Sequence, residues 1–533
     1  MSKTFTRAEV AKHNTEDSLW CIIDHRVYDL TDFLDAHPGG SVVLAQVAGK
    51  DATTDFYNLH RQEVIEKYRD QLCIGTIEGE TPEVISPEPG SLSTVPYAEP
   101  LWLRPEFKSP YYKESHRRLQ QAMRVFTDRY VTPEAQEKER DGTYISQELI
   151  DKMAEENVLA MRLGPGKHLH GRKLLGGVVD GKEFDYLHDM IVAQEMVRSN
   201  ARGFQDGNMA GMVISLTAVQ QWLRNAPLRE KVTEEVLSGR KKMCLAITEA
   251  FAGSDVAGLK TTATKTPDGK HYIVNGTKKW ITNGMFADYF VTGCRTEKGF
   301  TVLLIPRGEG VETKQIKTSY STAAATAFVQ FENVKVPVEN LLGEEHKGFI
   351  VIMSNFNHER FTMVCAVIRM CMTVTEECMK WCNQRIVFGK KLIEQPVMRQ
   401  KYFLLSPWLA SENDMLLTVG ARLARMISLC ESNQAWLESI AYQMCNMTYA
   451  QQAAHLGGPI GLLKSHATRS AQEIADHATN IFGGRGITQT GMGRVIEMFH
   501  RTYKFDAILG GTEEILADLG VRQAMKKFPK AML

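Results

Sequence analysis

The spacing of apolar residues changes twice along this chain. From about residue 108 apolar side chains recur at helical spacing, near residue 245 they begin to alternate, and after Gly348 the helical spacing returns. Helices, then an antiparallel β region, then long helices form an order with few precedents among known folds. With 533 residues the chain is also too long for one core. We therefore expect several domains, most of them within this helix–sheet–helix region.

The residues before this region are predicted to form a separate unit. Short strands are expected at residues 20–23 and 27–30, around a polar turn. From residue 79 the composition shifts to proline, serine, glutamate and glycine, which predicts a partly extended linker. The expected order is a small α+β domain, a linker, a helical domain, a β domain and a second helical domain, at residues 1–78, 79–107, 108–244, 245–345 and 346–533.

Local signals add detail to the larger region. Ser146 is expected to cap the N-terminus of a helix. Residues 271–274 and 277–281 are predicted to be two strands joined by Asn275-Gly276, the dipeptide most typical of a two-residue hairpin turn. Further strands are expected at residues 289–294, 300–305 and 327–331.

Composition and charge argue against several classes of protein. Lys+Arg and Asp+Glu both number 63, so the zero net charge offers no general attraction to nucleic acid or anionic membrane. No apolar run reaches the roughly 18 residues that a membrane helix needs, and acidic residues near the N-terminus argue against a signal or transit peptide.

The ten cysteines form no CxxC pair and are expected to be buried thiols in a reducing compartment. The C-terminal Ala531-Met532-Leu533 matches a peroxisomal signal except at Met532, so a cytoplasmic or peroxisomal location is expected.

A histidine pair near the N-terminus indicates a haem site. His37 begins a His-Pro-Gly-Gly sequence that lets the backbone turn tightly, and His60 follows a helical segment that Asp51 is expected to cap. This region resembles cytochrome b5-like haem-binding domains over essentially its whole length. The resemblance implies haem b with His37 and His60 as axial ligands. It also implies an iron that transfers single electrons rather than binding oxygen.

The larger part of the chain carries groups suited to a flavin dinucleotide. Trp280 and Thr282 are expected to alternate on one strand and to face the same side, where they supply an aromatic wall and a hydrogen-bond donor for an isoalloxazine ring. Thr248 is expected at the end of an adjacent strand. Arg385 and the glycine pair at 483–484 offer the cation and the close backbone N–H groups that a pyrophosphate needs.

Four segments together make residues 108–533 resemble the acyl-CoA dehydrogenase family. They are residues 244–258, 279–284, 385–395, and 480–484 with 510–512. The resemblance implies the fold of that family, FAD as the cofactor and an acyl-CoA as the substrate. The residues implied to bind FAD are Thr248, Ser254, Trp280, Thr282, Arg385, Phe388, Gln395, Asn480, Gly483, Gly484 and Thr512.

Two positions depart from the family pattern. Ala250-Phe251 replace the usual Pro-Gly in a loop that borders the substrate channel, which leaves the type of substrate open. Asn480 replaces a common glutamine, a change that should only weaken one contact to the adenine half of the cofactor.

The implied chemistry needs a carboxylate base for the substrate α-proton, while the β-hydrogen leaves as hydride to flavin N5. Many family members carry this glutamate directly before a Gly-Thr pair, but here that position is Gly510. A branched- and long-chain subset carries it on a helix, followed by arginine, as in Glu359-Arg360. We therefore predict Glu359 as the base, with a pKa raised by burial, and the Gly510 N–H as the group that polarises the thioester carbonyl. A surface glutamate paired with a helix neighbour is the alternative for Glu359.

These features predict an FAD-dependent acyl-CoA dehydrogenase of fatty acid metabolism that forms a trans-2-enoyl-CoA. Its electrons would pass to the fused haem, to an external flavoprotein acceptor, or to both. The alternatives are an acyl-CoA oxidase or another oxidation on the same fold, and a non-catalytic haem and flavin electron-relay protein. A homo-oligomer, a dimer or homotetramer, is expected because residues 385–389 resemble the segment that closes the FAD site of a neighbouring subunit. The space expected beside Gly510 predicts long or α-branched acyl chains.

Overall fold

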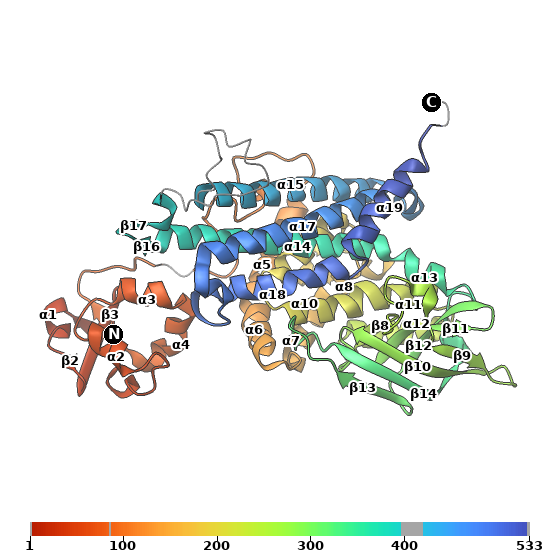
Figure 1. Ribbon diagram of the computed structural model, residues 1–533, viewed down its shortest axis with the longest axis horizontal. Helices are drawn as coiled ribbons and strands as arrows, with labels where there is room; N and C mark the ends of the chain where they lie inside the picture. Colours follow the sequence, from red (N-terminus) through yellow and green to blue (C-terminus); the bar gives the residue numbers. More distant parts are fainter. Residues whose placement is uncertain (1–2, 85–86, 396–418, 530–533) are drawn as a thin grey trace, which may run out of the picture. The chain divides into compact units, whose positions relative to one another are not determined.

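The computed structural model describes residues 3–84, 87–395 and 419–529 (Figure 1). The chain forms two compact units, each made of segments that are distant in the sequence. The first unit contains Met1–Glu88, Cys378–Gly420 and Thr479–Met498, and the second contains Pro89–Glu377, Ala421–Ala478 and Phe499–Leu533. Both units combine helices with a sheet, which confirms the predicted multidomain α+β class. Ala531-Met532-Leu533 lie outside the described residues.

The N-terminal part of the first unit is built on a five-stranded sheet with the order β1-β5-β4-β3-β2. All neighbouring strands in it are antiparallel except β1 and β5. Because successive side chains of a strand point to opposite faces, Cys21 and Ile23 pack on one side of the sheet and Ile22 on the other. The elements are β1 (Lys3–Phe5), α1 (Arg7–Val10), β2 (Asn14–Thr15), β3 (Ser18–Ile23), β4 (Arg26–Asp29), α2 (Ser41–Val47), α3 (Thr53–Leu59), α4 (Gln62–Leu72) and β5 (Cys73–Ile77). The two predicted strands are confirmed as β3 and β4.

Segments from the C-terminal half complete the first unit. Trp381 stacks on Phe482 with 5.2 Å between the ring centroids, which joins two long helices near the residues where they enter this unit. The elements concerned are the end of α14 (Phe356–Gln384), β16 (Ile386–Val387), β17 (Lys390–Lys391), η9 (Leu392–Glu394), the end of α17 (Gly457–Phe482), η10 (Gly483–Ile487), η11 (Gly491–Gly493) and the start of α18 (Arg494–Ile508).

The second unit begins with a group of helices. They are α5 (Glu114–Phe126), α6 (Thr132–Asp141), α7 (Gln147–Glu155), α8 (Val158–Met161), α9 (Tyr186–Val197), α10 (Arg202–Met209), α11 (Thr217–Trp222) and α12 (Ala226–Leu237). The π-helical turns η3 (Thr127–Val131) and η6 (Ala210–Leu216) join α5 to α6 and α10 to α11. The side-chain oxygen of Ser146 accepts the N–H of Leu149 at 3.2 Å, which confirms Ser146 as an N-cap.

The second half of the expected linker is packed into the second unit. Glu99 and Trp102 are buried. Arg124 donates to both carboxylate oxygens of Glu99 at 2.7 and 2.8 Å, and Arg369 lies 3.0 Å away. Arg124 also donates to Glu195 at 2.8 Å. The proline-rich composition predicted a partly extended linker, but the carboxylate of Glu99 is needed to neutralise two buried arginines, a requirement that composition does not show.

The β part of the second unit is an eight-stranded sheet. Its order is β13-β14-β10-β9-β11-β12-β15, with β8 paired to β11. The strands are β8 (Met243–Ala246), β9 (Thr262–Lys265), β10 (His271–Ile281), β11 (Tyr289–Thr296), β12 (Gly299–Pro306), β13 (Val311–Gln315), β14 (Ala327–Pro337) and β15 (Leu341–Leu342). They include the three further strands that the sequence predicted.

The predicted hairpin turn at Asn275-Gly276 is wrong. β10 runs unbroken through the dipeptide and pairs with β14 on both sides of it, with a shift in register at that point. The φ of Gly276 is +145°, and a Cβ atom there would lie 2.6 Å from the Cα of Thr261. Asn275 Oδ1 accepts the N–H of Asn333 at 2.7 Å. The dipeptide forms a β-bulge rather than a turn, because the single strand β14 pairs with β10 both before and after it.

Helices form the C-terminal part of the chain. They are α13 (Gly348–Ser354), α14, α15 (Val419–Asn446), α16 (Tyr449–His455), α17, α18 and α19 (Glu513–Met525). In the second unit α15 contacts α17 through the Asn433 side chain, which donates to Ser470 Oγ at 3.0 Å. It contacts α14 through Cys430, whose Sγ lies 3.5 Å from Thr375 Oγ1.

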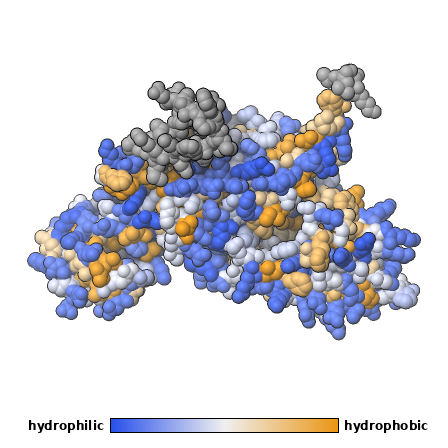
Figure 2. Space-filling view, in the orientation of Figure 1, coloured by the Kyte–Doolittle hydropathy of each residue, from blue (hydrophilic) through white to orange (hydrophobic). Residues whose placement is uncertain are grey.

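The surface mixes hydrophilic and hydrophobic residues on the face shown in Figure 2. Among the described residues, no helix is both long enough and apolar enough to cross a membrane.

Candidate functional site

Glu359 lies in the first turn of α14, in the part of that helix that belongs to the second unit. Its side chain is buried, and Oε2 has no hydrogen-bond partner among the described residues. Burial raises the pKa of Glu359 to about 7, while Arg360, Lys464 and His358 act in the opposite direction. The alternative of an exposed, paired surface glutamate is therefore wrong. A carboxyl group with this pKa can accept a proton near neutral pH.

Gly510 belongs to a turn beside this carboxyl group. A Cβ atom on Gly510 would lie 3.4 Å from Glu359 Oε1, so the two predicted catalytic positions are adjacent. Gly510 and Gly511 have φ values of +66° and +109°, a conformation that favours glycine. Arg360 Nε donates to the carbonyl of Gly510 at 2.9 Å, and Lys464 Nζ donates to that of Gly511 at 2.8 Å. Two cations therefore hold both carbonyl groups of the turn in place.

Lys464 is a site residue that was not predicted from the sequence. It is buried, and burial lowers its pKa to about 8. The available signal was a lysine inside an apolar helical stretch, where a charge needs a specific partner.

Met363 fills the space beside Gly510. Its Sδ atom lies 2.9 Å from the Cβ position of that glycine, so the prediction of open space there is wrong. Met363 belongs to a buried apolar cluster, and this surface next to the Glu359 carboxyl suits an acyl chain. The cluster contains Met209, Val213, Ile214 and Met363, with Leu245 and Leu509 packed against it.

A buried ion cluster lies on the same helices. Arg202 of α10 donates from Nε to Asp206 at 2.7 Å and from Nη2 to Asp506 at 2.5 Å, and its Nη1 lies 3.3 Å from Met370 Sδ. Burial raises the pKa of Asp206 despite the nearby guanidinium. The spacing of Arg202 and Asp206 on one helix was visible in the sequence, but Asp506 comes from a segment 304 positions away. This cluster was therefore not predicted from the sequence.

The predicted flavin wall lies at the end of β10. The N–H of Lys279 donates to the carbonyl of Thr248 at 2.9 Å, which places Thr248 beside Trp280. Trp280 is 50% exposed and has a φ of +59°. Thr282 lies in a turn after Ile281, the last residue of the strand, so regular alternation of Trp280 and Thr282 is wrong. A half-exposed indole next to a threonine still fits one face of a flavin ring.

The other predicted FAD-binding residues are divided between the units. Ser254 and Thr512 belong to the second unit, where Ser254 is exposed in a loop and Thr512 is the N-cap residue of α19. Phe388 is 94% exposed in the first unit. Gln395, also in the first unit, donates to the carbonyl of Val387 at 2.6 Å. The first unit holds Arg385, Phe388, Gln395, Asn480, Gly483 and Gly484.

The first unit gathers cations near its glycine pair. Arg385 and Arg485 both lie over the Trp381 ring, at 5.9 and 5.3 Å from its centroid. Apart from their chain neighbours, no described residue has an atom within 4 Å of the Cβ positions of Gly483 and Gly484. Two guanidinium groups close together, beside backbone that a ligand can approach, fit a pyrophosphate. Arg485 was not among the predicted residues, although it directly follows Gly484.

His37 and His60 face one another in the first unit. Their ring centroids are 6.0 Å apart, a gap that admits a metal bound at about 2 Å by one nitrogen of each ring. His37 Nδ1 donates to the carbonyl of Gly40 at 3.1 Å, which leaves Nε2 for the metal. His60 Nδ1 is buried without a partner among the described residues, and burial lowers the pKa of this imidazole. Phe33 and Phe56 pack against the two rings. This arrangement fits a haem with two axial histidines.

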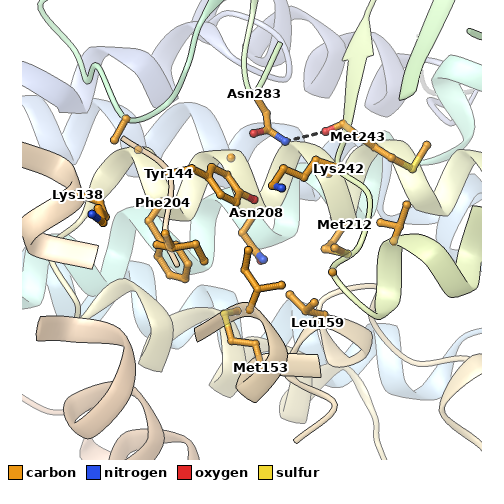
Figure 3. Close-up of a pocket in the computed structure, with 18 of the residues that line it drawn as sticks. Lys138, Tyr144, Met153, Leu159, Phe204, Asn208, Met212, Lys242, Met243 and Asn283 are labelled. Atoms are coloured by element: carbon orange, nitrogen blue, oxygen red, sulfur yellow. Dashed lines mark hydrogen bonds between the residues drawn. The ribbon is translucent and has the colours of Figure 1, made fainter. Parts of the chain in front are cut away.

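A small cavity of about 40 Å³ opens between the helical and β parts of the second unit (Figure 3). Its lining includes Tyr144, Phe204, Met212 and Asn283, and none of the predicted site residues. Asn283 Nδ2 donates to the carbonyl of Met243 at 2.9 Å, while Asn283 Oδ1 has no partner among the described residues. The volume suits a few water molecules bound to such polar groups.

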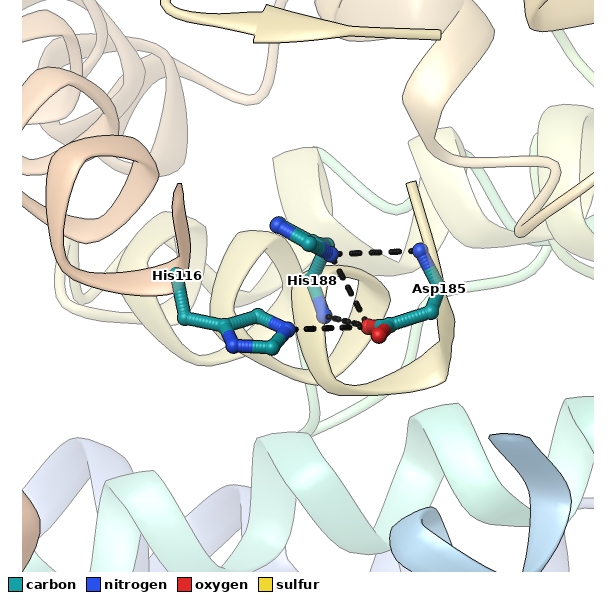
Figure 4. A group of neighbouring side chains, drawn as sticks. All are labelled: His116, Asp185 and His188. Atoms are coloured by element: carbon teal, nitrogen blue, oxygen red, sulfur yellow. Dashed lines mark hydrogen bonds and ion pairs between the residues drawn. The ribbon is translucent and has the colours of Figure 1, made fainter. Parts of the chain in front are cut away.

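His116, Asp185 and His188 are close enough together to resemble a metal site (Figure 4). Asp185 Oδ1 lies 3.0 Å from His116 Nε2 and 2.9 Å from His188 Nδ1. The remaining ring nitrogens contact the N–H of Lys113 and the hydroxyl of Ser115. Each histidine is the third residue of its helix, where its Nδ1 lies within hydrogen-bonding distance of the N–H of the residue before the helix. Hydrogen bonding therefore already accounts for this group, which joins the N-termini of α5 and α9.

Known proteins match both parts of the chain. The cytochrome b5-like heme/steroid binding domain matches residues 6–78. The N-terminal, middle and C-terminal domains of acyl-CoA dehydrogenase match residues 113–222, 244–334, and 346–406 with 417–525. Acyl-CoA dehydrogenase apdG of Emericella nidulans is 37% identical over 82% of this chain and 97% of its own length. Acyl-CoA dehydrogenase AFT10-1 of Alternaria alternata is 33% identical over 81% and 96%. The structure of an acyl-CoA dehydrogenase complexed with FAD from Bacillus anthracis superposes with a TM-score of 0.65 and 22% identity, over 81% of this chain and 71% of that one.

The fold and the domain matches define a flavin-dependent oxidoreductase joined to a b-type haem domain. Within that class, the chain belongs to the acyl-CoA dehydrogenase family, and its first domain matches the cytochrome b5-like heme/steroid binding domains.

Proposed function

We propose that this enzyme oxidises an acyl-CoA to the trans-2-enoyl-CoA with Glu359 as the base. One observation carries the proposal: a buried carboxyl group with a pKa of about 7, and with one oxygen that has no partner among the described residues, lies beside Gly510 and an apolar cluster. An exposed carboxylate would not have this pKa, and a fully hydrogen-bonded carboxylate would have no free oxygen for the substrate proton.

Different residues of the chain carry out the separate steps of this proposed reaction. Glu359 accepts the α-proton as the α-carbon–hydrogen bond breaks. The Gly510 N–H polarises the thioester carbonyl, on a turn that Arg360 and Lys464 hold in place. When FAD is bound, its N5 supplies the acceptor for the β-hydrogen, which leaves with an electron pair. One proton and one hydride leave together, so the α–β bond becomes a double bond and the substrate loses two electrons.

His37 and His60 would hold a haem in the first unit. Such a haem would exchange one electron at a time and would offer these electrons a second route. One substrate oxidation would therefore need two such one-electron transfers, with an external acceptor to take up both electrons. Replacing His60 with alanine should abolish the low-spin bis-imidazole spectrum while the flavin absorbance stays. An unchanged haem spectrum would show that His60 is not a ligand.

The function is tested by anaerobic mixing with a panel of acyl-CoA thioesters that vary in length and α-branching. Flavin bleaching and the reduced haem band should both appear with at least one of them. Flavin bleaching without haem reduction would indicate that the electrons pass to an external flavoprotein acceptor and not to the haem. Rapid peroxide formation in air would indicate an oxidase, and no bleaching with any thioester would leave only the electron-relay alternative. Because Met363 must move to admit an α-branch, branched substrates should bind more weakly in the native enzyme than in Met363→Ala.

The remaining predicted partner is a second copy of the chain. Phe388 is exposed on the β16–β17 hairpin, next to Ile386, which is also exposed. Exposed aromatic and aliphatic side chains beside an FAD-binding arginine suit closure of a neighbouring subunit's cofactor site.

A further inference from the structure

The loop that carries the axial ligand His60 makes charged contacts inside the first unit. Arg494, the first residue of α18, lies with Nη2 3.0 Å from Glu63 Oε1. Arg61 lies with Nη1 3.4 Å from the carbonyl of Met492 and with Nε 3.5 Å from the Glu63 carboxylate. Glu63 is therefore shared by two arginines, one from each side of the contact.

The residues just before His60 make contacts of a different kind. Gln384, the last residue of α14, donates a hydrogen bond to the carbonyl of Tyr57. A Cβ atom on Gly491 would lie 3.6 Å from the carbonyl oxygen of Leu59, so the backbones approach closely there. Charged and neutral contacts thus surround the ligand on both sides in the sequence.

The segments on the other side of this contact border the proposed FAD-binding residues. Gln384 immediately precedes Arg385. Gly491 and Arg494 follow η10, which begins with Gly483 and Gly484. Trp381 and Phe482, which precede these two segments in the sequence, stack on each other. The haem-ligand loop therefore contacts both pieces of chain that are proposed to hold the dinucleotide.

The contact is polar and partly exposed. The side chains of Glu63 and Arg494 are 51% and 26% exposed. Ion pairs at this exposure contribute little to folding stability and are screened by salt, but they strongly affect how fast two surfaces associate. A contact of this kind suits a domain that docks and releases, rather than one that is locked in place.

We propose that residues 57–63 form an intramolecular docking surface, through which the haem domain docks on Gln384 and on residues 491–494 of the FAD-binding segment. Glu63 and Arg494 are its positioning residues, and docking controls how fast electrons from acyl-CoA oxidation reach the haem. The kinetic part of this inference rests on the proposed function.

The test uses the full-length enzyme loaded with FAD and haem, as Glu63→Arg, Arg494→Glu and the double variant. Each single variant should slow haem reduction by acyl-CoA about tenfold or more, while the rate of flavin bleaching stays native. The double variant should recover most of the rate because the ion pair is restored with opposite polarity. Glu16→Arg is the matched control, since Glu16 is an exposed glutamate of the same domain in the turn between β2 and β3, and it should leave both rates native.

Hydrogen exchange provides a second measurement that does not depend on activity. Peptides covering residues 57–63 and 488–494 should exchange faster in both single variants, and in native enzyme at high salt, than in native enzyme at low salt. Native exchange and native haem reduction in both single variants would overturn the docking surface. If the native haem is never reduced by acyl-CoA but exchange responds as expected, docking stands and the proposed electron route fails.

Discussion

At the scale of single residues, two positions far apart in the sequence define the proposed chemistry. Glu359 and Gly510 meet because α14 and the turn after α18 approach within van der Waals distance, with Met363 packed between them and the rest of the cluster. The absence of a side chain at residue 510 therefore leaves room for the packing that surrounds the buried carboxyl group of residue 359. A side chain at 510 would compete with Met363 for the same space.

Replacing Glu359 with glutamine keeps the shape of the side chain but removes its ability to accept a proton. The rate of flavin bleaching by acyl-CoA should fall about 10²–10⁴-fold, while dithionite still reduces the haem. In the native enzyme the rate should rise as the pH increases through about 7, because only the deprotonated carboxylate accepts a proton. Stopped-flow absorbance over a pH series measures both effects. Glu309→Gln, at an exposed position, is the control, and a near-native rate in the Glu359 variant would place the base elsewhere.

Replacing Gly510 with alanine should destabilise the protein and slow flavin bleaching. The left-handed φ of +66° costs a residue with a Cβ atom about 1–2 kcal/mol, and that atom would lie 2.9 Å from Met363 Sδ. Urea unfolding measures the loss of stability. Gly308→Ala should change little, because no described residue other than its chain neighbours lies within 4 Å of its Cβ position. Equal effects of the two substitutions would contradict the turn geometry.

At the scale of secondary-structure elements, tertiary contacts override two local signals. Asn275-Gly276 has the composition of a hairpin turn, yet β14 pairs with both halves of β10 and turns the dipeptide into a bulge. The chain before α5 has the composition of a free linker, yet Glu99 is held by Arg124 and Arg369. In both cases a partner distant in the sequence decides the local conformation.

Replacing Glu99 with glutamine should lower the free energy of unfolding by about 3–5 kcal/mol, because buried arginines would lose a charged partner. Arg369 and Arg124 hold the pKa of Glu99 well below its usual range despite burial. The stabilising contribution of Glu99 should therefore be complete above the usual carboxyl pKa and decline progressively as the pH falls toward the much lower pKa of the folded state. Denaturation at pH 7 and at about pH 3 measures this decline. Glu88→Gln, exposed in the same stretch, should have no effect at either pH. An equal loss of stability at both pH values would contradict the charge argument.

At the scale of the whole molecule, one chain combines an acyl-CoA dehydrogenase fold with a haem domain. Its compact units do not follow the order of the sequence, because the ends of α14 and α17 and the start of α18 group with the N-terminal domain. The proposed FAD-binding residues are divided between the two units for the same reason.

If a second copy closes the cofactor site, replacing Phe388 with serine should leave the fold intact but reduce both FAD retention and the proportion of oligomer. Phe388 is 94% exposed, so its loss removes no core packing. Sedimentation velocity with detection at the flavin absorbance measures both quantities together. Phe528→Ser, another exposed position, is the control. A native monomer that is saturated with FAD and fully active would rule out subunit closure.

The sequence alone was enough to predict the order of helices and sheet, the Ser146 cap, several strands and a histidine pair around a tight turn, whereas the helix before His60 has Ala52 rather than the expected Asp51 as its N-cap residue. These features depend on hydrophobic period, on turn chemistry and on residues close together in the chain. Segments such as 279–284 and 480–484 also predicted the family, because several short motifs in a set order are more specific than any one of them.

Only the tertiary structure decided which side chains are buried together. The raised pKa of Glu359 comes from desolvation by helices that the sequence does not order in space. Lys464, and the cluster of Arg202, Asp206 and Asp506, could not be predicted as parts of the site, because the energy of a buried charge depends on partners from distant segments. The same reason explains the bulge in β10 and the anchored linker. Local spacing determines the kind of element, whereas burial and charge pairing depend on packing.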